Sequence, residues 1–167
     1  MTRRQIAILV LFDVVWALAV FGQHSTVLWQ ALLTALMVVL ATGMRTLALA
    51  IAVSGVALDA VLIQYNVLSM AGTPSAMPLH LALLWLGFGL ALAACRKRMP
   101  QSPVTLALLG GALGSLGYYL GERFGALELA PTTAAGVAII GLCWAVLFPL
   151  CRTLFSALAP NPLGGKS

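Results

Sequence analysis

The sequence contains very little charge. Only 8% of its 167 residues are Asp, Glu, Lys or Arg, and only 4 of these are acidic. Soluble domains carry roughly 25% charged residues, so this chain has too few charges to cover the surface of a water-soluble protein. Hydrophobic residues make up 62% of the chain. The composition excludes a soluble domain and favours a protein whose outer surface lies in lipid.

Cysteine and catalytic motifs are also scarce. The three cysteines, Cys95, Cys143 and Cys151, are too few and too widely spaced to form a disulfide framework. The sequence contains no GxSxG, Walker glycine loop or HExxH motif, and no GxGxxG in a strand-to-helix context. We therefore predict no catalytic residue, no metal site and no cofactor, and an enzyme is the less favoured class. A membrane redox enzyme that uses His24 and His80 stays open as an alternative.

Long uncharged runs dominate the chain. Without Asp, Glu, Lys and Arg, five runs remain, at residues 14–44, 46–58, 60–95, 99–121 and 129–151. Two of them are too long for one helix: the first breaks at Gly22-Gln23-His24-Ser25, and the third breaks around Gly72-Thr73-Pro74. About 20 apolar residues cross a hydrocarbon core of ~30 Å. We therefore predict six spans, at residues 6–22, 26–42, 46–66, 78–95, 103–121 and 131–154.

Each span is expected to be a helix, because backbone N–H and C=O groups inside a bilayer need partners within the protein. The alternating segments of ~10 residues that are typical of membrane β-strands are absent. The expected loops are short except for 67–77, so consecutive helices should be antiparallel neighbours. The sequence thus predicts an all-α integral membrane protein, a compact bundle of six transmembrane helices in which residues 1–167 form a single membrane domain.

Basic residues are distributed unevenly over the predicted loops. Arg123, beside Glu122 and Glu128, falls at one end of the bundle. All other basic residues fall at the opposite end, and these are Arg3, Arg4, Arg45, Arg96, Lys97, Arg98, Arg152 and Lys166. The positive-inside rule then places both termini in the cytoplasm of a multi-pass protein of the bacterial inner membrane. The expected partners are the lipid bilayer and, as open alternatives, another membrane protein or a homo-oligomer; no nucleic acid is expected.

Two spans carry stripes of small residues. The fifth has Gly110, Gly114, Gly117 and Gly121, and the sixth has Ala134, Ala138, Gly141 and Ala145 at the same intervals. Small residues let the backbones of membrane helices approach closely. We therefore predict that the fifth and sixth spans pack together through these residues.

Two acidic residues, Asp13 and Asp59, fall within the predicted hydrocarbon depth. Such residues are costly and are functional candidates. His24 returns to nearly the same side of its helix as Asp13, and Asn66 shares a small and polar helix face with Asp59. Two such faces turned inward would line a narrow polar path that opens to the outer surface. The alternative is that a protonated Asp only forms an interhelical hydrogen bond.

The aromatic residues suggest packing rather than a site. An interfacial belt is expected from Trp29, Tyr65, Tyr118 and Tyr119, which fall near the outer ends of spans. Deeper positions, in the core or facing lipid, are expected for Trp16, Trp85 and Trp144.

Three stretches of the chain resemble a bacterial inner-membrane family, the domain of unknown function 2878. They are GVALDAVL at 55–62, PLHLALLWLGF at 78–88 and LGGALGSLGYYLGERFGA at 109–126. The family has Trp soon after the proline of the fourth span, where this chain has His80. The resemblance implies no established activity. It does imply a lipid-related setting, since members of the family are often encoded near fatty-acid-modifying enzymes.

We therefore expect a small polytopic membrane protein that binds or transports a small or lipidic solute. Asp13, Asp59, Asn66 and His24 are its candidate intramembrane polar site. A non-catalytic subunit or assembly partner of a lipid-modifying or envelope complex is the alternative, with the glycine stripe as its assembly face.

Overall fold

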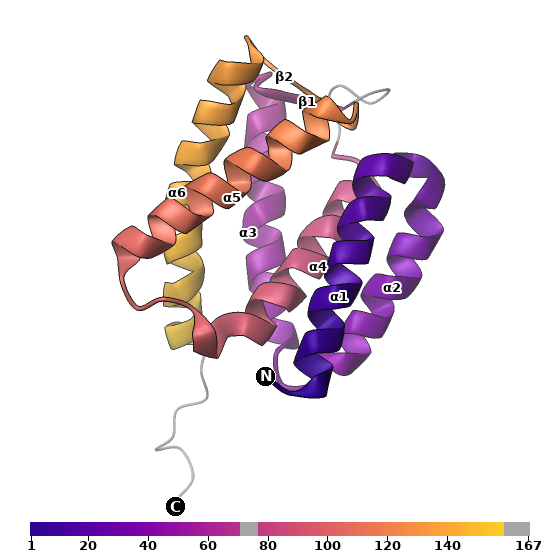
Figure 1. The fold of residues 1–167 in the computed structure, drawn as a ribbon, viewed down its shortest axis with the longest axis vertical. Coiled ribbons are helices and arrows are strands. Elements are labelled where there is room, and N and C mark those ends of the chain that lie inside the picture. The colour runs from indigo at the N-terminus through magenta and orange to yellow at the C-terminus, as the bar shows by residue number, and fades with distance from the viewer. Residues whose placement is uncertain (71–76, 159–167) are drawn as a thin grey trace, which may run out of the picture.

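The fold is all-α apart from one short two-stranded ribbon. A computed structural model describes residues 1–70 and 77–158. Its helices run alternately up and down (Figure 1), so that α1 begins and α6 ends at the same end of the bundle. The α-helices are α1 (Arg3–Ala17), α2 (Val27–Leu40), α3 (Arg45–Gln64), α4 (Leu79–Cys95), α5 (Pro103–Arg123) and α6 (Thr133–Ala157). Lys166 and the predicted break at Gly72-Thr73-Pro74 lie outside the described residues.

Five helical segments among the described residues are long and apolar enough to cross a membrane. The first segment, Arg3–Leu40, has 38 residues and contains a turn. At this turn a π-helix, η1 (Leu18–Gly22), meets a 3-10 helix, η2 (Gln23–Thr26), and Gln23 has φ +46°. The chain reverses there, and α1 and α2 lie side by side as antiparallel helices (Figure 1).

Polar side chains define the starts of three helices. Thr2 and Gln5 form a capping box at the start of α1, which satisfies backbone N–H groups that have no partner within the helix. Ser102 caps α5 and is followed by Pro103, whose fixed φ suits the first helical position. Thr132 caps α6, which continues as one helix through Pro149.

A short β-ribbon at the upper end is an element that the sequence pattern did not predict. Strand β1 (Leu68–Met70) pairs antiparallel with β2 (Leu127–Leu129). In each strand the first and third residues are buried and hydrophobic, and the middle residue, Ser69 or Glu128, is polar and more exposed. This alternation is only three residues long, so it does not stand out from loop sequence in the chain. The ribbon joins the outer ends of α3 and α5 (Figure 1).

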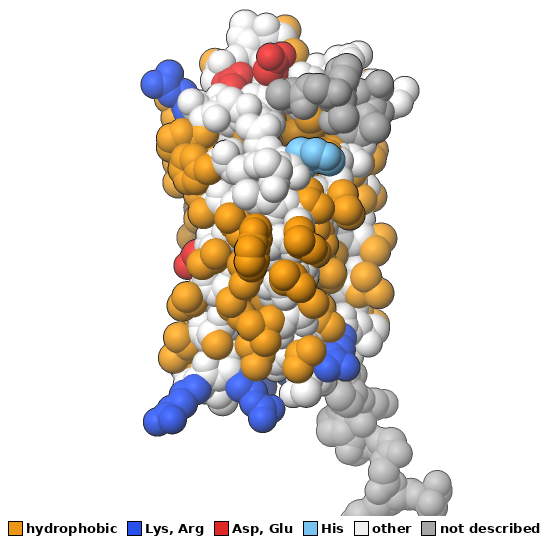
Figure 2. Space-filling model, turned by 90° about the vertical axis from the view of Figure 1, so that its right-hand side faces the viewer, with side chains coloured by type: hydrophobic (Ala, Val, Ile, Leu, Met, Phe, Trp, Pro, Cys, Tyr) orange, Lys and Arg blue, Asp and Glu red, His pale blue; other side chains and the backbone are white. Residues whose placement is uncertain are grey.

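Charge separates along the bundle axis. Figure 2 shows hydrophobic side chains over the middle of one face, most Lys and Arg at the lower end, and acidic side chains near the upper end and at mid-height on the left edge. The lower end holds the start of α1 with Arg3, the start of α3 with Arg45, and the end of α4, which Arg96 follows directly. Large exposed hydrophobic residues include Val39, 65% exposed on α2, and Leu108, 70% exposed on α5. A surface of this kind suits lipid rather than water.

The helices α5 and α6 pack closely, as predicted, through a seam that contains Gly110, Gly114, Gly141 and Ala145 of the predicted stripes together with Gly111 and Ser115. A Cβ on Gly111 would lie 3.2 Å from the carbonyl oxygen of Gly141, and one on Gly141 would lie 2.4 Å from Ser115 Oγ. Ser115 also donates a hydrogen bond across the seam to the Val137 carbonyl oxygen at 3.2 Å. Ala145 lies beside Gly111.

The predicted stripe residues divide between several surroundings. Gly110 and Gly114 face the Trp144 turn of α6, Gly121 faces Leu127 of β2, and a Cβ added to Gly117 would have no neighbour within 4 Å. Ala134 and Ala138 are exposed. Spacing alone predicts that all of them share one seam, but only Gly110 and Gly114 of the four stripe glycines face α6, where Gly111 and Ser115 join them.

Candidate functional site

A buried carboxylate lies at the centre of the bundle. Asp59 on α3 is 0% exposed. Its Oδ2 accepts a hydrogen bond of 2.6 Å from Trp85 Nε1 on α4, and its Oδ1 accepts one of 2.5 Å from the Tyr118 hydroxyl on α5. Both carboxylate oxygens therefore have donors, which lowers the cost of burying the group. The three side chains, here called the Asp59 triad, connect three helices.

Two glycines make room for the large rings around this triad. Gly55 lies one helical turn before Asp59, and a Cβ there would come within 2.0 Å of the Trp85 ring. Gly114 lies one turn before Tyr118, and a Cβ there would come within 2.2 Å of the Trp144 ring. The sequence thus pairs each polar residue with a glycine on the same helix face, and an indole occupies the space above each glycine.

The rings form a continuous aromatic cluster. The Trp85 and Trp144 rings stack with centroids 5.3 Å apart and an interplanar angle of 24°. Phe88 meets both indoles edge-on, at 5.5 and 5.2 Å. Tyr118 meets Trp144 edge-on at 6.3 Å. These offset and edge-to-face arrangements are the favoured ones for aromatic pairs, so the rings hold one another in place.

A cavity of about 330 Å³ lies beside this cluster. Side chains of α1, α4, α5 and α6 line it, and Met70 and Leu127 of the ribbon border its outer end. Two of its lining residues, Asp13 on α1 and Leu113 on α5, are exposed, so the cavity reaches the surface of the bundle between these helices. We call it the aromatic cavity, after its aromatic lining residues Phe12, Trp16, Trp85, Phe88, Tyr118 and Trp144.

Two buried polar atoms of cavity-lining residues, neither of them accessible from the cavity itself, have no hydrogen-bond partner among the described residues. They are Nδ1 of His80 and Nε1 of Trp144, in side chains that are only 8% and 7% exposed. A buried polar atom without a partner is costly, and native proteins leave few of them. Mostly apolar walls with a few polar groups are typical of small-molecule sites.

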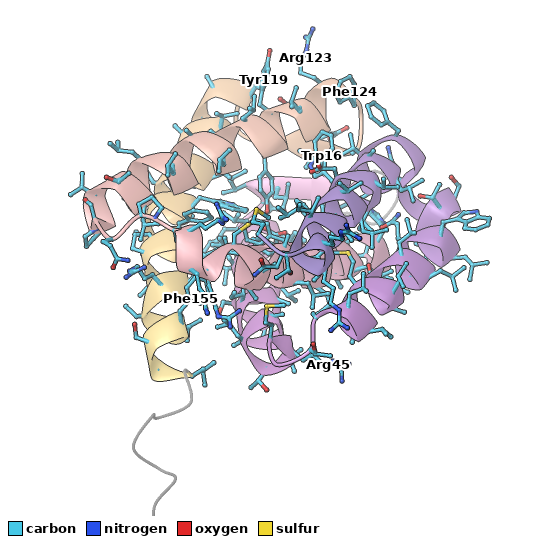
Figure 3. The ribbon with its side chains drawn as sticks, turned by 60° about the horizontal axis from the view of Figure 1, so that its bottom comes forward. Trp16, Arg45, Tyr119, Arg123, Phe124 and Phe155 are labelled. Atoms are coloured by element: carbon cyan, nitrogen blue, oxygen red, sulfur yellow. The ribbon has the colours of Figure 1, made fainter. Side chains whose placement is uncertain are left out.

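Two turns make contact beside the upper end of the cavity. Ala19 and Val20 of η1 line the cavity, and the next residue, Phe21, packs against Phe124 with ring centroids 4.8 Å apart. Gln23 donates a hydrogen bond of 3.0 Å to the Gly125 carbonyl oxygen. In Figure 3, Trp16 lies on the side of α1 that faces α5, below Phe124.

The structure does not bring the four predicted polar residues together. Asp59 is buried and bonded to Trp85 and Tyr118, whereas Asp13, His24 and Asn66 are exposed. Asp13 borders the aromatic cavity, but Asp59 lies behind its wall. Aligning residues on each helix cannot give the rotation of one helix against another, so the expected polar path is not the arrangement observed.

Sequence reasoning misses three of the residues that form the site. Tyr118 is expected in the interfacial belt, but it is 8% exposed and turns inward to Asp59. The roles of His80 and Trp144 in the cavity wall do not follow from the sequence pattern either. The available signal is the glycine one turn before Asp59 and before Tyr118, which favours an inward-facing position for both.

A metal centre finds no support in the described part of the chain. Within residues 1–70 and 77–158, no three His, Cys, Asp or Glu side chains come together in a way that could hold a metal ion. His24 and His80 therefore lack a third ligand of these types there.

Comparison with known proteins places the chain in one family. The model of a family described as "Protein of unknown function (DUF2878)" matches residues 5–150. No curated protein and no solved structure matches the chain. The matched region contains the Asp59 triad and all of the aromatic lining residues of the cavity.

Proposed function

We propose that this chain, which belongs to the family of proteins of unknown function DUF2878, is a membrane protein that binds a small lipophilic molecule in its aromatic cavity. The observation that carries the proposal is the cavity itself: about 330 Å³, lined by six aromatic side chains, with two buried polar atoms of lining residues that lack hydrogen-bond partners among the described residues. This volume is at the lower end of the ~300–1,000 Å³ of small-molecule sites.

The cavity suits a ligand that arrives from the bilayer. Its opening lies between α1 and α5, where Asp13 and Leu113 are exposed, rather than at the ends of the bundle. Lipid would surround that part of the surface if the helices span a membrane. A lipophilic solute dissolved in the bilayer could then enter sideways without crossing water.

The Asp59 triad supports such a site by fixing the cavity wall. Trp85 and Tyr118 each have one side in the cavity wall and a polar atom bonded to Asp59 behind it. A binding site needs its wall held in one arrangement before the ligand arrives, because ordering side chains on binding lowers affinity. Asp59 is therefore assigned as a positioning residue rather than a ligand contact.

We further propose six membrane crossings with both termini in the cytoplasm of a bacterial inner membrane. The turn at Gln23 divides the segment Arg3–Leu40 into two antiparallel arms, which would each cross the membrane. Arg3, Arg45 and Arg96 lie at the end of the bundle that would face the cytoplasm under the positive-inside rule. The helix α2 has 14 residues and would span ~21 Å alone, so η2 would complete its crossing.

Filling the cavity tests the proposal. Gly117 lines the cavity, and a Cβ added there would meet nothing within 4 Å, so Gly117→Leu places a side chain in the cavity without a backbone clash. Ala112→Leu is the matched control, because Ala112 is exposed on the same helix and does not line the cavity. A neutral lipophilic fluorophore, N-phenyl-1-naphthylamine, would report binding by energy transfer from the cavity tryptophans.

Saturable binding is expected for the wild-type protein and for Ala112→Leu in detergent. Gly117→Leu should weaken it by at least about tenfold, which corresponds to ~1.4 kcal/mol. Equal binding by all three proteins, or energy transfer that never saturates, would show that the fluorophore partitions elsewhere and would refute the proposed site.

A further inference from the structure

The aromatic cavity has an acidic side chain in its wall and no basic counterpart among the described residues. Asp13 lines the cavity, and no Lys or Arg is among the described residues that line it. His80 also lines the cavity, and its imidazole is the lining group whose nitrogen could become positively charged. Its side chain is only 8% exposed. An anionic ligand would therefore meet a carboxylate and find no cation to offset it.

Asp13 itself lacks a partner among the described residues, where no hydrogen bond or ion pair to its carboxylate occurs within the usual distances. The nearest basic residue on its own helix is Arg4, nine residues earlier, which is ~14 Å along the axis. The other basic residues of the described helix ends lie at the same lower end as Arg4 or, for Arg123, at the upper end. An acidic side chain at this depth calls for a cation.

The aromatic rings supply the second half of a cation site. Phe12 and Trp16 lie beside Asp13 on α1, and Trp85, Phe88 and Tyr118 form the facing wall. The positive N–H edge of Trp85 and the hydroxyl of Tyr118 are directed at Asp59, which lies behind the wall. Ring faces carry the negative part of the aromatic quadrupole and attract cations, most strongly where water is excluded. Trp85 is stacked on Trp144, whereas Trp16, one turn after Asp13, has no such ring contact among the described residues, so its face is the one nearest Asp13 for a cation.

We infer that the aromatic cavity binds a small lipophilic cation, an amine, quaternary ammonium or phosphonium, whose charge pairs with Asp13 and whose apolar groups contact the rings. This inference rests on the proposed function, since it names the class of molecule that the cavity takes. A neutral lipophile would leave Asp13 unpaired, and an anion would be repelled by it. Charge complementarity thus selects the cation among lipophilic ligands of similar size.

Two ions of nearly equal shape and opposite charge separate charge recognition from apolar binding. Tetraphenylphosphonium is the cation and tetraphenylborate is the anion, and each would be titrated by calorimetry into the purified full-length protein in neutral detergent. The variants are Asp13→Asn, which removes the charge, and Asp13→Glu, which keeps it. Glu128→Gln is the control, because Glu128 is an exposed acid on β2 that does not line the cavity.

The wild-type protein, Asp13→Glu and Glu128→Gln should bind the cation at least about tenfold more tightly than the anion. Asp13→Asn should lose about tenfold or more of its affinity for the cation, and its preference for the cation should largely disappear. Asp13→Glu guards against a folding defect, because a misfolded protein would not regain the preference when the charge is restored. An unchanged preference in Asp13→Asn, or equal affinity for the two ions in the wild type, would overturn the inference.

Binding of the two ions to Gly117→Leu shows whether a negative result refutes only the cation inference or the proposed function as well. If both ions bind equally and Gly117→Leu weakens both, the cavity binds lipophiles without regard to charge; the cation inference is then wrong and the proposed function stands. If Gly117→Leu changes neither affinity, both the inference and the proposed function are wrong.

Discussion

Replacing members of the Asp59 triad provides a sensitive test of the buried network. In Asp59→Asn the carboxylate becomes an amide, which has one oxygen acceptor and one N–H₂ donor. Trp85 and Tyr118 both donate to Asp59 in the wild type. In the variant the amide oxygen can still accept from Trp85, but the amide N–H₂ then faces the Tyr118 hydroxyl, which has to accept and leaves its own O–H without the Asp59 acceptor. We expect this variant to lower the free energy of unfolding by about 1–3 kcal/mol, the cost of an unsatisfied buried polar group.

The second variant removes one of the two donors. Tyr118→Phe eliminates the hydroxyl that donates to Asp59 Oδ1. Hydrogen bonds between membrane helices contribute on average about 0.6 kcal/mol and at most about 1.7 kcal/mol. Because Asp59 is 0% exposed and water cannot replace the lost donor, we expect a cost near the upper value.

The double variant Asp59→Asn with Tyr118→Phe should cost little more than Asp59→Asn alone. The amide oxygen still accepts from Trp85, and the phenyl ring has no O–H that needs an acceptor, so the amide N–H₂ facing the ring replaces the Tyr118 O–H as the one unsatisfied donor. The coupling energy should be about 1 kcal/mol or more, measured by reversible unfolding of the four proteins in mixed micelles. Additive costs, equal within about 0.5 kcal/mol, would show that Asp59 and Tyr118 do not interact and would refute the triad.

Further predictions concern the glycines and the outer turns. Gly114→Ala should lower the thermal unfolding midpoint, because the added Cβ would lie 2.2 Å from the Trp144 ring and overpacking costs about 1–3 kcal/mol. Gly117→Ala should leave the midpoint unchanged or raise it, because its Cβ would have no neighbour within 4 Å. Equal shifts in the two variants would contradict the packing described. Phe124→Ala removes the contact with Phe21 at the outer end of the cavity, and it should speed ligand dissociation in stopped-flow measurements with little effect on the extent of binding at saturation; an unchanged rate would show that this contact does not restrict exit.

The helices can be predicted from the sequence because each is an uncharged run that ends at a break or a charged cluster. The α1–α2 turn is expected at Gly22 to Ser25, and the structure has η1 and η2 there. Asp59 is singled out because a lone acid in an apolar helix is costly. Its donor Trp85 lies 26 residues away on another helix, and no spacing within one helix reveals such a pair.

The rest of the site depends on how the helices are rotated against each other. A stripe of four glycines suggests one packing face, but Gly117 lines the aromatic cavity, whereas Gly110 and Gly114 face α6. Tyr118 illustrates the same limit, because its position in the span indicates its depth but not its direction. Membrane helices are apolar on all sides, so hydrophobic periodicity does not identify their inward face.

Mass spectrometry of small molecules that co-purify with the protein tests the central claim most directly. The wild-type protein and Ala112→Leu would be extracted from the membrane in mild detergent beside Gly117→Leu, in equal amounts. A lipophilic compound retained in stoichiometric amount by the first two proteins and absent from Gly117→Leu is the expected result. The same compounds at the same level in all three samples would contradict a ligand in the aromatic cavity.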